Sequence, residues 1–255
     1  MLHTIAAITR KDLQILWKDP RGLGNLFLMP TMFIVVMTMA LGRMFGPERA
    51  GVPNVVQHNV PAWTLFGLFF ISQQIASSLL EEKKLGTFRR LQVAPISRPE
   101  LLIGKLVPFF LVNLAQVVTM FAAGALLLPL LGAPRLAIGS HPFALMAITV
   151  AASLAASGLG LLIASLAKTT EQIGGLGSML VVTMAALGGV MVPRMAMPQS
   201  MQTVGLLTPH AWALTAYQDV LVKGAGLVAV LPAVAVLLGF ATAFFAVALV
   251  KFQWD

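Results

Sequence analysis

Residues 81–95 read EEKKLGTFRRLQVAP and lie between two long apolar stretches of the chain. Six of the ten residues at 81–90 are charged, although only 10% of the whole sequence is charged. Hydrophobic residues make up 58% of the chain and its mean hydropathy is +0.88, whereas about a quarter of the residues of a soluble domain are charged. The sequence therefore predicts an all-α integral membrane protein with a single membrane domain over residues 1–255.

The absence of cysteine and the distribution of charge exclude several classes of site. Without cysteine there is neither a disulfide framework nor a thiolate metal site. The four histidines are scattered along the chain, and we expect neither a metal site nor a catalytic residue. The net charge of +8 comes from basic residues that flank apolar stretches. This pattern is typical of membrane topology signals, and we expect no nucleic-acid partner.

Six segments are apolar over the roughly 20 residues that a helix needs to cross a bilayer. They cover approximately residues 23–44, 62–80, 101–128, 143–167, 173–192 and 227–249. The third is longer than one crossing needs and contains Pro108, so we expect it to tilt or to begin as an interfacial turn. If the N-terminus is cytoplasmic, 12 basic residues fall on the cytoplasmic side and 5 on the outer side. This asymmetry predicts that both termini, and with them residues 81–99, are cytoplasmic.

Two further segments are expected to lie at the membrane without crossing it. Residues 1–22 include TIAAITRKDLQILWKDP at 4–20, which forms an amphipathic helix with Asp12 as the one charge on its apolar arc. Such a helix lies in the headgroup plane against membrane lipid. Residues 193–226 are apolar but are broken by prolines, and Thr208 followed by Pro209 is a good helix start. We expect two short helices here that form a re-entrant outer hairpin packed against other helices.

The predicted spans lack the groups that would drive transport. They contain no Asp, Glu or His; Arg43 ends the first span, and Lys105 counts with the cytoplasmic residues. We therefore expect no titratable group inside the bundle, which disfavours an ion-coupled carrier and a membrane hydrolase. The phosphate-binding pattern G-x-x-x-x-G-K-[ST] is also absent. If the chain pumps, its energy must come from another chain.

The segment that opens at Glu81 is the candidate contact for that other chain. We expect a helix from Glu81 to Leu91, with Leu85, Phe88 and Leu91 forming an apolar edge among charges. Such an edge fits a groove on a cytosolic partner. The alternative is a solvated loop that only fixes the topology, but the glutamates in the segment contribute little to topology.

Three stretches of the chain, beginning with this segment, resemble a known family. EKKLGT at 82–87, the entry ISRPELLIGKL at 96–106 and the stretch GGVMVPRMAMPQSMQTVGLLTPHAWALTAY at 188–217 are similar to the coupling segment and the outer hairpin of ATP-binding-cassette (ABC) type 2 exporter permeases. The resemblance covers nearly the whole chain. It implies a dimer with a second permease copy or a close relative, each seated on a cytosolic ABC ATPase subunit. ATP and Mg would be bound by that ATPase and no cofactor by this chain.

The resemblance also implies site residues. The ATPase-coupling candidates are Glu81, Glu82, Lys83, Lys84, Gly86, Thr87, Phe88, Arg89 and Leu91, and the outer hairpin or gate candidates are Pro193, Pro198, Thr208, Pro209 and Trp212. Lys84 departs from the family, which often has an acidic residue there. The possible substrate path comprises Gln73, Gln74, Ser77, Met184 and Met191, chosen because polar groups avoid lipid and methionine adapts to varied shapes. Ordinary helix packing is the alternative for all five.

These expectations lead to one hypothesis and one rival. The hypothesis is a permease subunit, not itself an enzyme, of an ATP-driven exporter in the cytoplasmic membrane, where it moves an amphipathic, drug-like, lipid-linked or glycan substrate outward. The rival is a non-transporting assembly or anchor protein that recruits a cytosolic partner. We also weigh His210 as a pH sensor against a locally hydrogen-bonded cap residue.

Overall fold

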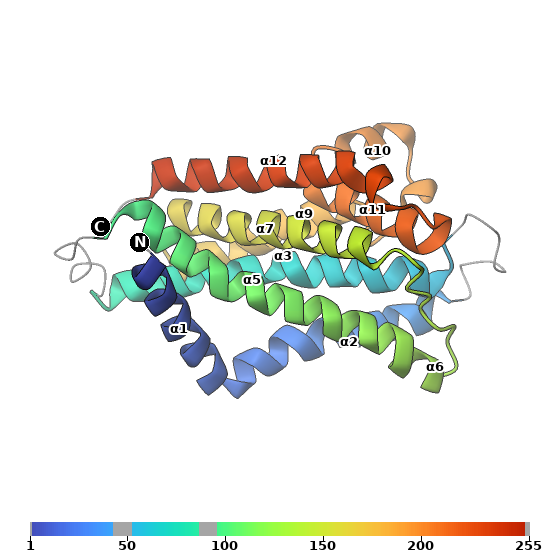
Figure 1. Ribbon diagram of the computed structural model, residues 1–255, viewed down its shortest axis with the longest axis horizontal. Helices are drawn as coiled ribbons and strands as arrows, with labels where there is room; N and C mark the ends of the chain where they lie inside the picture. Colours follow the sequence, from blue (N-terminus) through green and yellow to red (C-terminus); the bar gives the residue numbers. More distant parts are fainter. Residues whose placement is uncertain (1, 43–52, 87–95, 253–255) are drawn as a thin grey trace.

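The computed structural model describes residues 2–42, 53–86 and 96–252, and every element in these ranges is a helix, as predicted (Figure 1). The elements are α1 (Leu2–Lys18), α2 (Pro20–Leu41), α3 (Val55–Lys84), α5 (Arg98–Ala122), η1 (Ala123–Leu127), α6 (Leu128–Leu130), α7 (Pro142–Leu166), α8 (Thr170–Gln172), η2 (Ile173–Gly177), α9 (Ser178–Leu187), η3 (Arg194–Ala196), α10 (Gln199–Gly205), α11 (Pro209–Lys223) and α12 (Leu227–Lys251). Of the short pieces, η1 and η2 are π-helical and η3 is a 3-10 turn.

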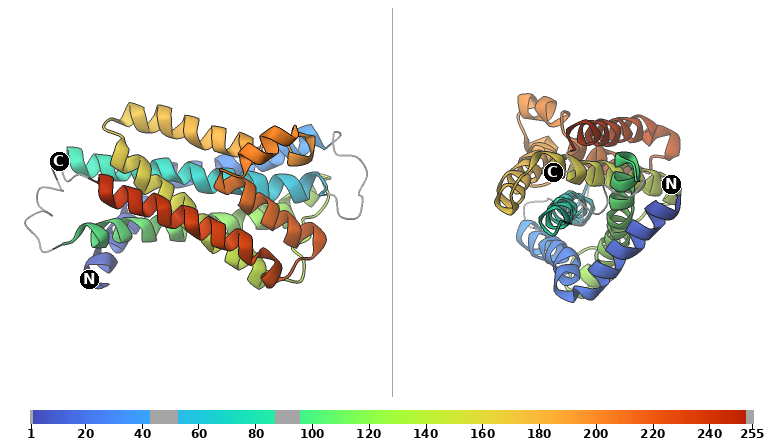
Figure 2. Two further views of the ribbon diagram at one scale, coloured as in Figure 1. Left: turned by 90° about the horizontal axis from the view of Figure 1, so that it is seen from above. Right: turned by 90° about the vertical axis from the view of Figure 1, so that its left-hand side faces the viewer.

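Helix α3 is the central rod of the bundle. It begins with a capping box, in which the Asn54 side chain accepts from the Gln57 backbone N–H at 2.8 Å and the Gln57 side chain accepts from the Asn54 N–H at 3.2 Å. It continues for 30 residues, or about 45 Å at 1.5 Å per residue. Helices α2, α5, α7, α9 and α11 pack around it, and the end view shows it inside this ring (Figure 2).

Helices α2 and α12 stand at the periphery and keep large apolar side chains exposed, such as Met32 and Val36 on α2 and Val228 and Val250 on α12. Apolar residues surround both helices instead of forming one stripe, which is the pattern of a helix in contact with lipid. Helix α12 packs along α7, where a Cβ at Gly158 would stand 3.1 Å from the Ala241 carbonyl oxygen. The small residue therefore permits a close backbone approach.

The two ends of the bundle differ in what they carry. At one end lie the start of α1, the end of α3, the start of α5 and the end of α12 (Figure 1). We call this the charged end. At the other end lie α10, α11 and the start of α12, and we call this the hairpin end. The first and last helices thus place their terminal residues at the same end, as the predicted topology requires.

Five helices in the described ranges are long and apolar enough to cross a membrane: Pro20–Leu41, Val55–Lys84, Arg98–Leu130, Pro142–Leu166 and Leu227–Lys251. They coincide with five of the six predicted spans. The remaining predicted span, 173–192, contains η2 and α9, which run beside α3 (Figure 2), and α8 precedes it. The count of six crossings stays a prediction.

The N-terminal helix and the hairpin region have the predicted helices with shifted bounds. Helix α1 ends at Lys18, because Asp19 caps α2 by accepting from the Gly22 N–H at 2.9 Å and Pro20 starts the next helix. The hairpin region holds α10 and α11, joined by a tight turn at Leu206–Thr208. Their depth in a membrane stays a prediction.

Candidate coupling site and substrate pocket

Four charged side chains meet at the charged end and join three helices. Lys105 Nζ of α5 lies 2.9 Å from Asp12 Oδ2 of α1 and 2.8 Å from Glu82 Oε1 of α3. Lys11 Nζ of α1 forms a second ion pair with the same Glu82 carboxylate. Lys105 also donates to Ser78 Oγ at 3.2 Å. We call Lys11, Asp12, Glu82 and Lys105 the charge cluster.

The charge cluster is largely withdrawn from solvent. Lys105 is 0% exposed and Asp12 is 2% exposed. Burial raises the pKa of the Asp12 carboxyl, and the neighbouring Lys105 ammonium opposes that rise. Charges this deep persist only when they are paired. The pairing also explains why Asp12 sits on the apolar arc of α1: that arc faces α5, where Ile8 would touch a Cβ added at Gly104.

One sequence-based expectation is wrong here, and Glu82 has contacts that the sequence did not reveal. The bundle does contain a titratable group, because Lys105 lies within α5 and is buried, so it cannot be counted with the solvated flank. Glu82 is buried too, at 7% exposure, and it contacts Lys11 and Lys105 of this same chain. Its position gives it a role in holding α1, α3 and α5 together. The coupling role predicted for Glu82 stays a prediction.

The coupling segment changes direction just after α3. The predicted helix past Lys84 is wrong for Leu85 and Gly86: Leu85 is the C-cap, and Gly86 has φ +69°, which favours glycine. Leu85 is 80% exposed at this turn. Among the predicted coupling residues, Thr87, Phe88, Arg89 and Leu91 lie outside the described residues.

The other predicted coupling residues surround this turn. Glu81 is exposed on the last turn of α3. Lys83 Nζ lies 5.1 Å from the centroid of the Phe252 ring, so the residue that follows α12 packs against α3. Lys84 Nζ donates to Thr170 Oγ1 at 2.9 Å and links α3 to α8. The end of α3 is thus tied to the end of α12 and to α8 as well as to α1 and α5.

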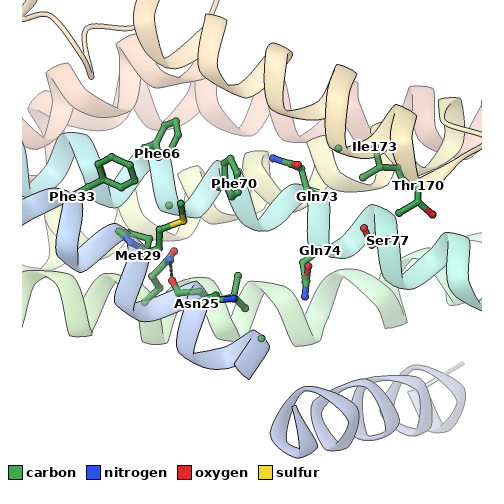
Figure 3. A pocket seen from close by; sticks show the side chains of 16 residues that line it. Asn25, Met29, Phe33, Phe66, Phe70, Gln73, Gln74, Ser77, Thr170 and Ile173 are labelled. Carbon is green, nitrogen blue, oxygen red and sulfur yellow. Dashed lines mark hydrogen bonds between the residues drawn. The ribbon is translucent and has the colours of Figure 1, made fainter. Parts of the chain in front are cut away.

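A pocket of about 280 Å³ opens beside the middle of α3 (Figure 3). Phe33 of α2 and Phe66 and Phe70 of α3 line it, with ring centroids 6.3 Å apart for Phe33–Phe66 and 5.5 Å for Phe66–Phe70. Phe33 also stacks on Trp63 at 4.9 Å. We call this cavity the aromatic pocket.

Polar side chains line the side of the aromatic pocket nearer the charged end. Gln73, Gln74 and Ser77 of α3 belong to this lining, with Thr170 of α8 (Figure 3). Gln116 of α5 lines the pocket farther from that end, where a Cβ added at Gly67 would lie 2.9 Å from its Nε2. Gln73 Oε1 accepts from Ser178 Oγ at 3.0 Å, and Gln116 Nε2 donates to the Leu26 carbonyl at 2.6 Å. Three predicted path residues, Gln73, Gln74 and Ser77, therefore share one pocket.

Met184 and Met191, the other two predicted path residues, do not line the aromatic pocket. Both pack against the hydrophobic core near the hairpin end. Asn113 bonds the Ser153 carbonyl at 3.4 Å and Ser157 Oγ at 3.5 Å, so it serves as interhelical packing.

A second cavity, of about 480 Å³, adjoins the first at the charged end. Gln74 and Ser77 line both cavities, and Asp19, Glu81 and the charge cluster's Lys11, Asp12 and Glu82 line this one. We call it the inner cavity. The two cavities together form a continuous lining from the charge cluster to the aromatic wall.

The predicted gate residues shape the hairpin end. Pro193 and Pro198 precede η3 and α10. Thr208 is the N-cap of α11 and Pro209 its first residue, as predicted, but the Thr208 hydroxyl donates back to the Gly205 carbonyl at 2.8 Å and does not cap the helix. Trp212 Nε1 donates to the Leu206 carbonyl at 2.8 Å. These bonds hold the turn between α10 and α11.

His210 is buried at the hairpin end, and its ring centroid lies 4.1 Å from that of Phe69. Neither ring nitrogen has a hydrogen-bond partner among the described residues. Burial lowers the pKa of His210 to about 3. The expected local hydrogen bond is therefore wrong, and the side chain stays neutral at physiological pH. At the other end of α11, Lys223 and Asp219 form an i,i+4 ion pair at 2.7 Å.

The sequence analysis did not predict the charge cluster or the phenylalanines of the aromatic pocket, although the sequence contains a pattern that indicates each of them. Lys105 is the single charge in LLIGKLVPFF, and Asp12 is the single charge on an apolar arc. A charge in apolar surroundings requires an oppositely charged neighbour. Phe66 and Phe70 are spaced one turn apart and share a helical face with Gln73, Gln74 and Ser77. In the described ranges, no three His, Asp or Glu side chains gather as a metal site would require.

Comparison with known proteins places this architecture in a family. The ABC-2 type transporter family profile matches residues 3–222. The chain is 32% identical over 178 residues to the inner membrane transport permease YhhJ of Escherichia coli (strain K12), covering 69% of this chain and 46% of that protein. It is 29% identical over 174 residues to the linearmycin resistance permease protein LnrN of Bacillus subtilis (strain 168), covering 68% and 43%. The chain thus spans less than half the length of the relatives it matches. It is a multi-pass membrane protein that belongs to the ABC-2 type transporter family.

Proposed function

We propose that this chain is the transmembrane permease subunit of an ATP-driven exporter. It works in the cytoplasmic membrane with both termini on the cytoplasmic side. A separate cytosolic ABC ATPase binds ATP and Mg and supplies the energy, and a second permease copy or a close relative completes the pathway. Family membership supports the class of protein. The balance of 12 basic residues against 5 supports the orientation.

The observation that carries this proposal is the continuity of α3. One 30-residue helix bears the coupling residues Glu81–Lys84 at its end and the pocket residues Phe66, Phe70 and Gln73 in its middle. A long helix packed on all sides moves as a rigid body, so displacement at its end reaches the pocket. The charge cluster adds α1 and α5 to the moving unit.

The aromatic pocket supports an apolar or amphipathic substrate. Three phenylalanines with a few amide and hydroxyl groups are typical of a small-molecule site. One relative is named as a resistance permease, and another as an inner membrane transport permease. We therefore propose outward movement of an amphipathic, drug-like, lipid-linked or glycan molecule, with the α10–α11 hairpin as the exit gate.

The test is to purify the tagged chain from native membranes in mild detergent and identify what accompanies it. We expect an ATPase that contains a phosphate-binding loop, and ATP hydrolysis by the purified complex. Recovery of an adaptor or signalling protein and no ATPase would instead support an anchoring role. In reconstituted vesicles, Glu82→Ala should uncouple hydrolysis from transport without preventing insertion, whereas Glu171→Ala, at an exposed carboxylate of the same end, should not.

A further inference from the structure

Among the described residues, the lining of the aromatic pocket contains polar groups but no charged side chain. Its polar members are amides and hydroxyls: Asn25, Gln73, Gln74, Ser77, Gln116 and Thr170. A charged ligand group placed here would lose its hydration without meeting an opposite charge, which costs far more than burying a neutral group that can be hydrogen-bonded. The composition of the lining therefore selects against ions.

Two amide atoms in this lining have unused hydrogen-bonding capacity. Gln116 is 1% exposed, and its Oε1 has no partner among the described residues while its Nε2 is bonded to Leu26. Gln73 Nε2 is likewise buried and without a partner in the described ranges, while its Oε1 accepts from Ser178. A buried amide atom without a partner is costly. Two residues of the pocket lining thus carry one acceptor and one donor without a partner among the described residues.

The position of Gln116 is fixed by close packing. A Cβ added at Gly67 would lie 2.9 Å from Gln116 Nε2 and 3.1 Å from Pro30 Cγ, so α2, α3 and α5 approach closely here. The amide cannot easily turn away, because its Nε2 is held by the Leu26 carbonyl. The free acceptor is therefore a fixed feature of the pocket wall.

The size and the neighbourhood of the pocket indicate how a ligand would lie. A volume of about 280 Å³ is near the lower end of small-molecule sites, which run from roughly 300 Å³. It holds part of an amphipathic molecule. Asp19 and Glu81 line the adjoining inner cavity and add negative charge on the approach from the charged end, which disfavours anions.

We propose that the aromatic pocket binds uncharged amphipathic molecules whose polar group carries hydroxyls or amides. The polar group bonds Gln73 and Gln116, and the apolar body lies along Phe33, Phe66 and Phe70. This narrows the substrate class of the proposed function, on which it rests. It predicts that a neutral polyol or amide head is preferred over a sulfate or a quaternary ammonium on the same apolar chain.

The test uses three probes that share a dodecyl chain with a terminal bromine and differ in the head: glucosyl, sulfate or trimethylammonium. The full chain is placed in lipid nanodiscs with Trp17, Trp212 and Trp254 changed to Phe, which leaves Trp63 as the only tryptophan. Because Phe33 lines the pocket and stacks on Trp63 at 4.9 Å, bromine in the pocket quenches Trp63 emission. Probe that merely dissolves in the bilayer quenches without saturation.

We expect saturable quenching by the glucosyl probe, with a Kd at least about 30-fold below that of either charged probe, because a charged head has to be desolvated. Gln116→Leu should raise the Kd for the glucosyl probe about threefold to tenfold through loss of one hydrogen bond. Gln74→Leu serves as a second variant if Gln116→Leu fails to fold. Gln199→Leu, on the exposed start of α10, is the matched control and should leave the Kd unchanged.

Equal or tighter binding of a charged probe would overturn the proposal, as would quenching that stays unsaturable or that neither pocket variant weakens. Binding is measured on this chain alone. A failure to recover an ATPase would therefore count against the proposed function but not against the proposed ligand class. A loss of head-group preference would count against the ligand class but not against the proposed function.

Discussion

The charged end and the hairpin end of the molecule are held together by different forces. At the charged end, Lys105 binds Asp12 and Glu82, so three helices depend on one buried ammonium. At the hairpin end, neutral hydrogen bonds and apolar packing dominate: Thr149 and Tyr217 share a hydrogen bond of 2.8 Å, and His210 packs on Phe69 without a polar partner. Ion pairs can exchange partners when water or another chain arrives, whereas close packing cannot be rearranged by small steps.

This difference indicates a division of labour. It agrees with the proposed function, in which the charged end would receive the movement of the ATPase and the hairpin end would form the exit gate.

Lys105→Met should be the most damaging single change. It leaves the buried Asp12 and Glu82 carboxylates with only the partly exposed Lys11 ammonium as a neighbouring cation, at a cost of about 3–5 kcal/mol in unfolding free energy. Denaturant titration in nanodiscs measures it. The control is Lys223→Met, which removes an exposed i,i+4 pair worth about 0.3–0.5 kcal/mol. If both variants lose the same small amount, the charge cluster does not hold the helices together.

Gly205→Ala tests the close packing of the hairpin end. The added Cβ would lie 2.3 Å from the Leu187 carbonyl oxygen, so α10 must shift away from α9, at a cost of roughly 1–3 kcal/mol. Gly239→Ala in α12 is the control, since its Cβ meets no atom within 4 Å, and it should be neutral or stabilising by up to about 1 kcal/mol. Protease sensitivity of the hairpin reports the shift, and equal resistance in both variants would contradict it.

His210 should make the hairpin end sensitive to acid. Its pKa is about 3 in the folded protein, against about 6.5 when solvated, so its contribution is intact above pH 6.5 and is lost as the pH falls toward 3. At pH 5.5 the loss is on the order of 1 kcal/mol. Unfolding midpoints of the parent and of His210→Leu, taken at pH 7.5 and 5.5, isolate this effect. The variant should lose less on acidification, and an identical pH dependence would argue against a buried neutral histidine.

Thr208→Val should have the smallest effect. It removes the hydroxyl that donates to the Gly205 carbonyl at 2.8 Å, which is worth about 0.5–1.5 kcal/mol. Thr208→Ser keeps the donor and should stay closer to the parent in thermal unfolding. If Val and Ser behave alike, the hydroxyl does not stabilise the turn between α10 and α11.

The fold was more predictable from the sequence than the site. Apolar runs long enough to cross a bilayer dictate helices, and prolines such as Pro20 and Pro209 mark their starts. The sequence predicts a helix to Leu91 because residues that favour helices continue past Lys84. The structure ends α3 at Lys84, and Gly86 has a left-handed backbone conformation.

The site depended on contacts that the sequence cannot display. Asp12 and Lys105 are 93 residues apart, and neither local pattern names the other. Gln73, Gln74 and Ser77 were found because polar residues avoid lipid, but their aromatic neighbour Phe33 comes from another helix. Met184 and Met191 were grouped with them by residue type, and packing places both elsewhere.

The most direct test of the central claim follows the pocket while the partner ATPase turns over. The chain has no cysteine, so Ser77→Cys introduces a single thiol where the two cavities meet. In the complex with its ATPase, Mg-ATP should change the maleimide labelling rate of this thiol severalfold, and adding Glu82→Ala should abolish that change while ATP hydrolysis continues. A labelling rate that ignores nucleotide, or one that responds equally with and without Glu82, would contradict transmission through α3.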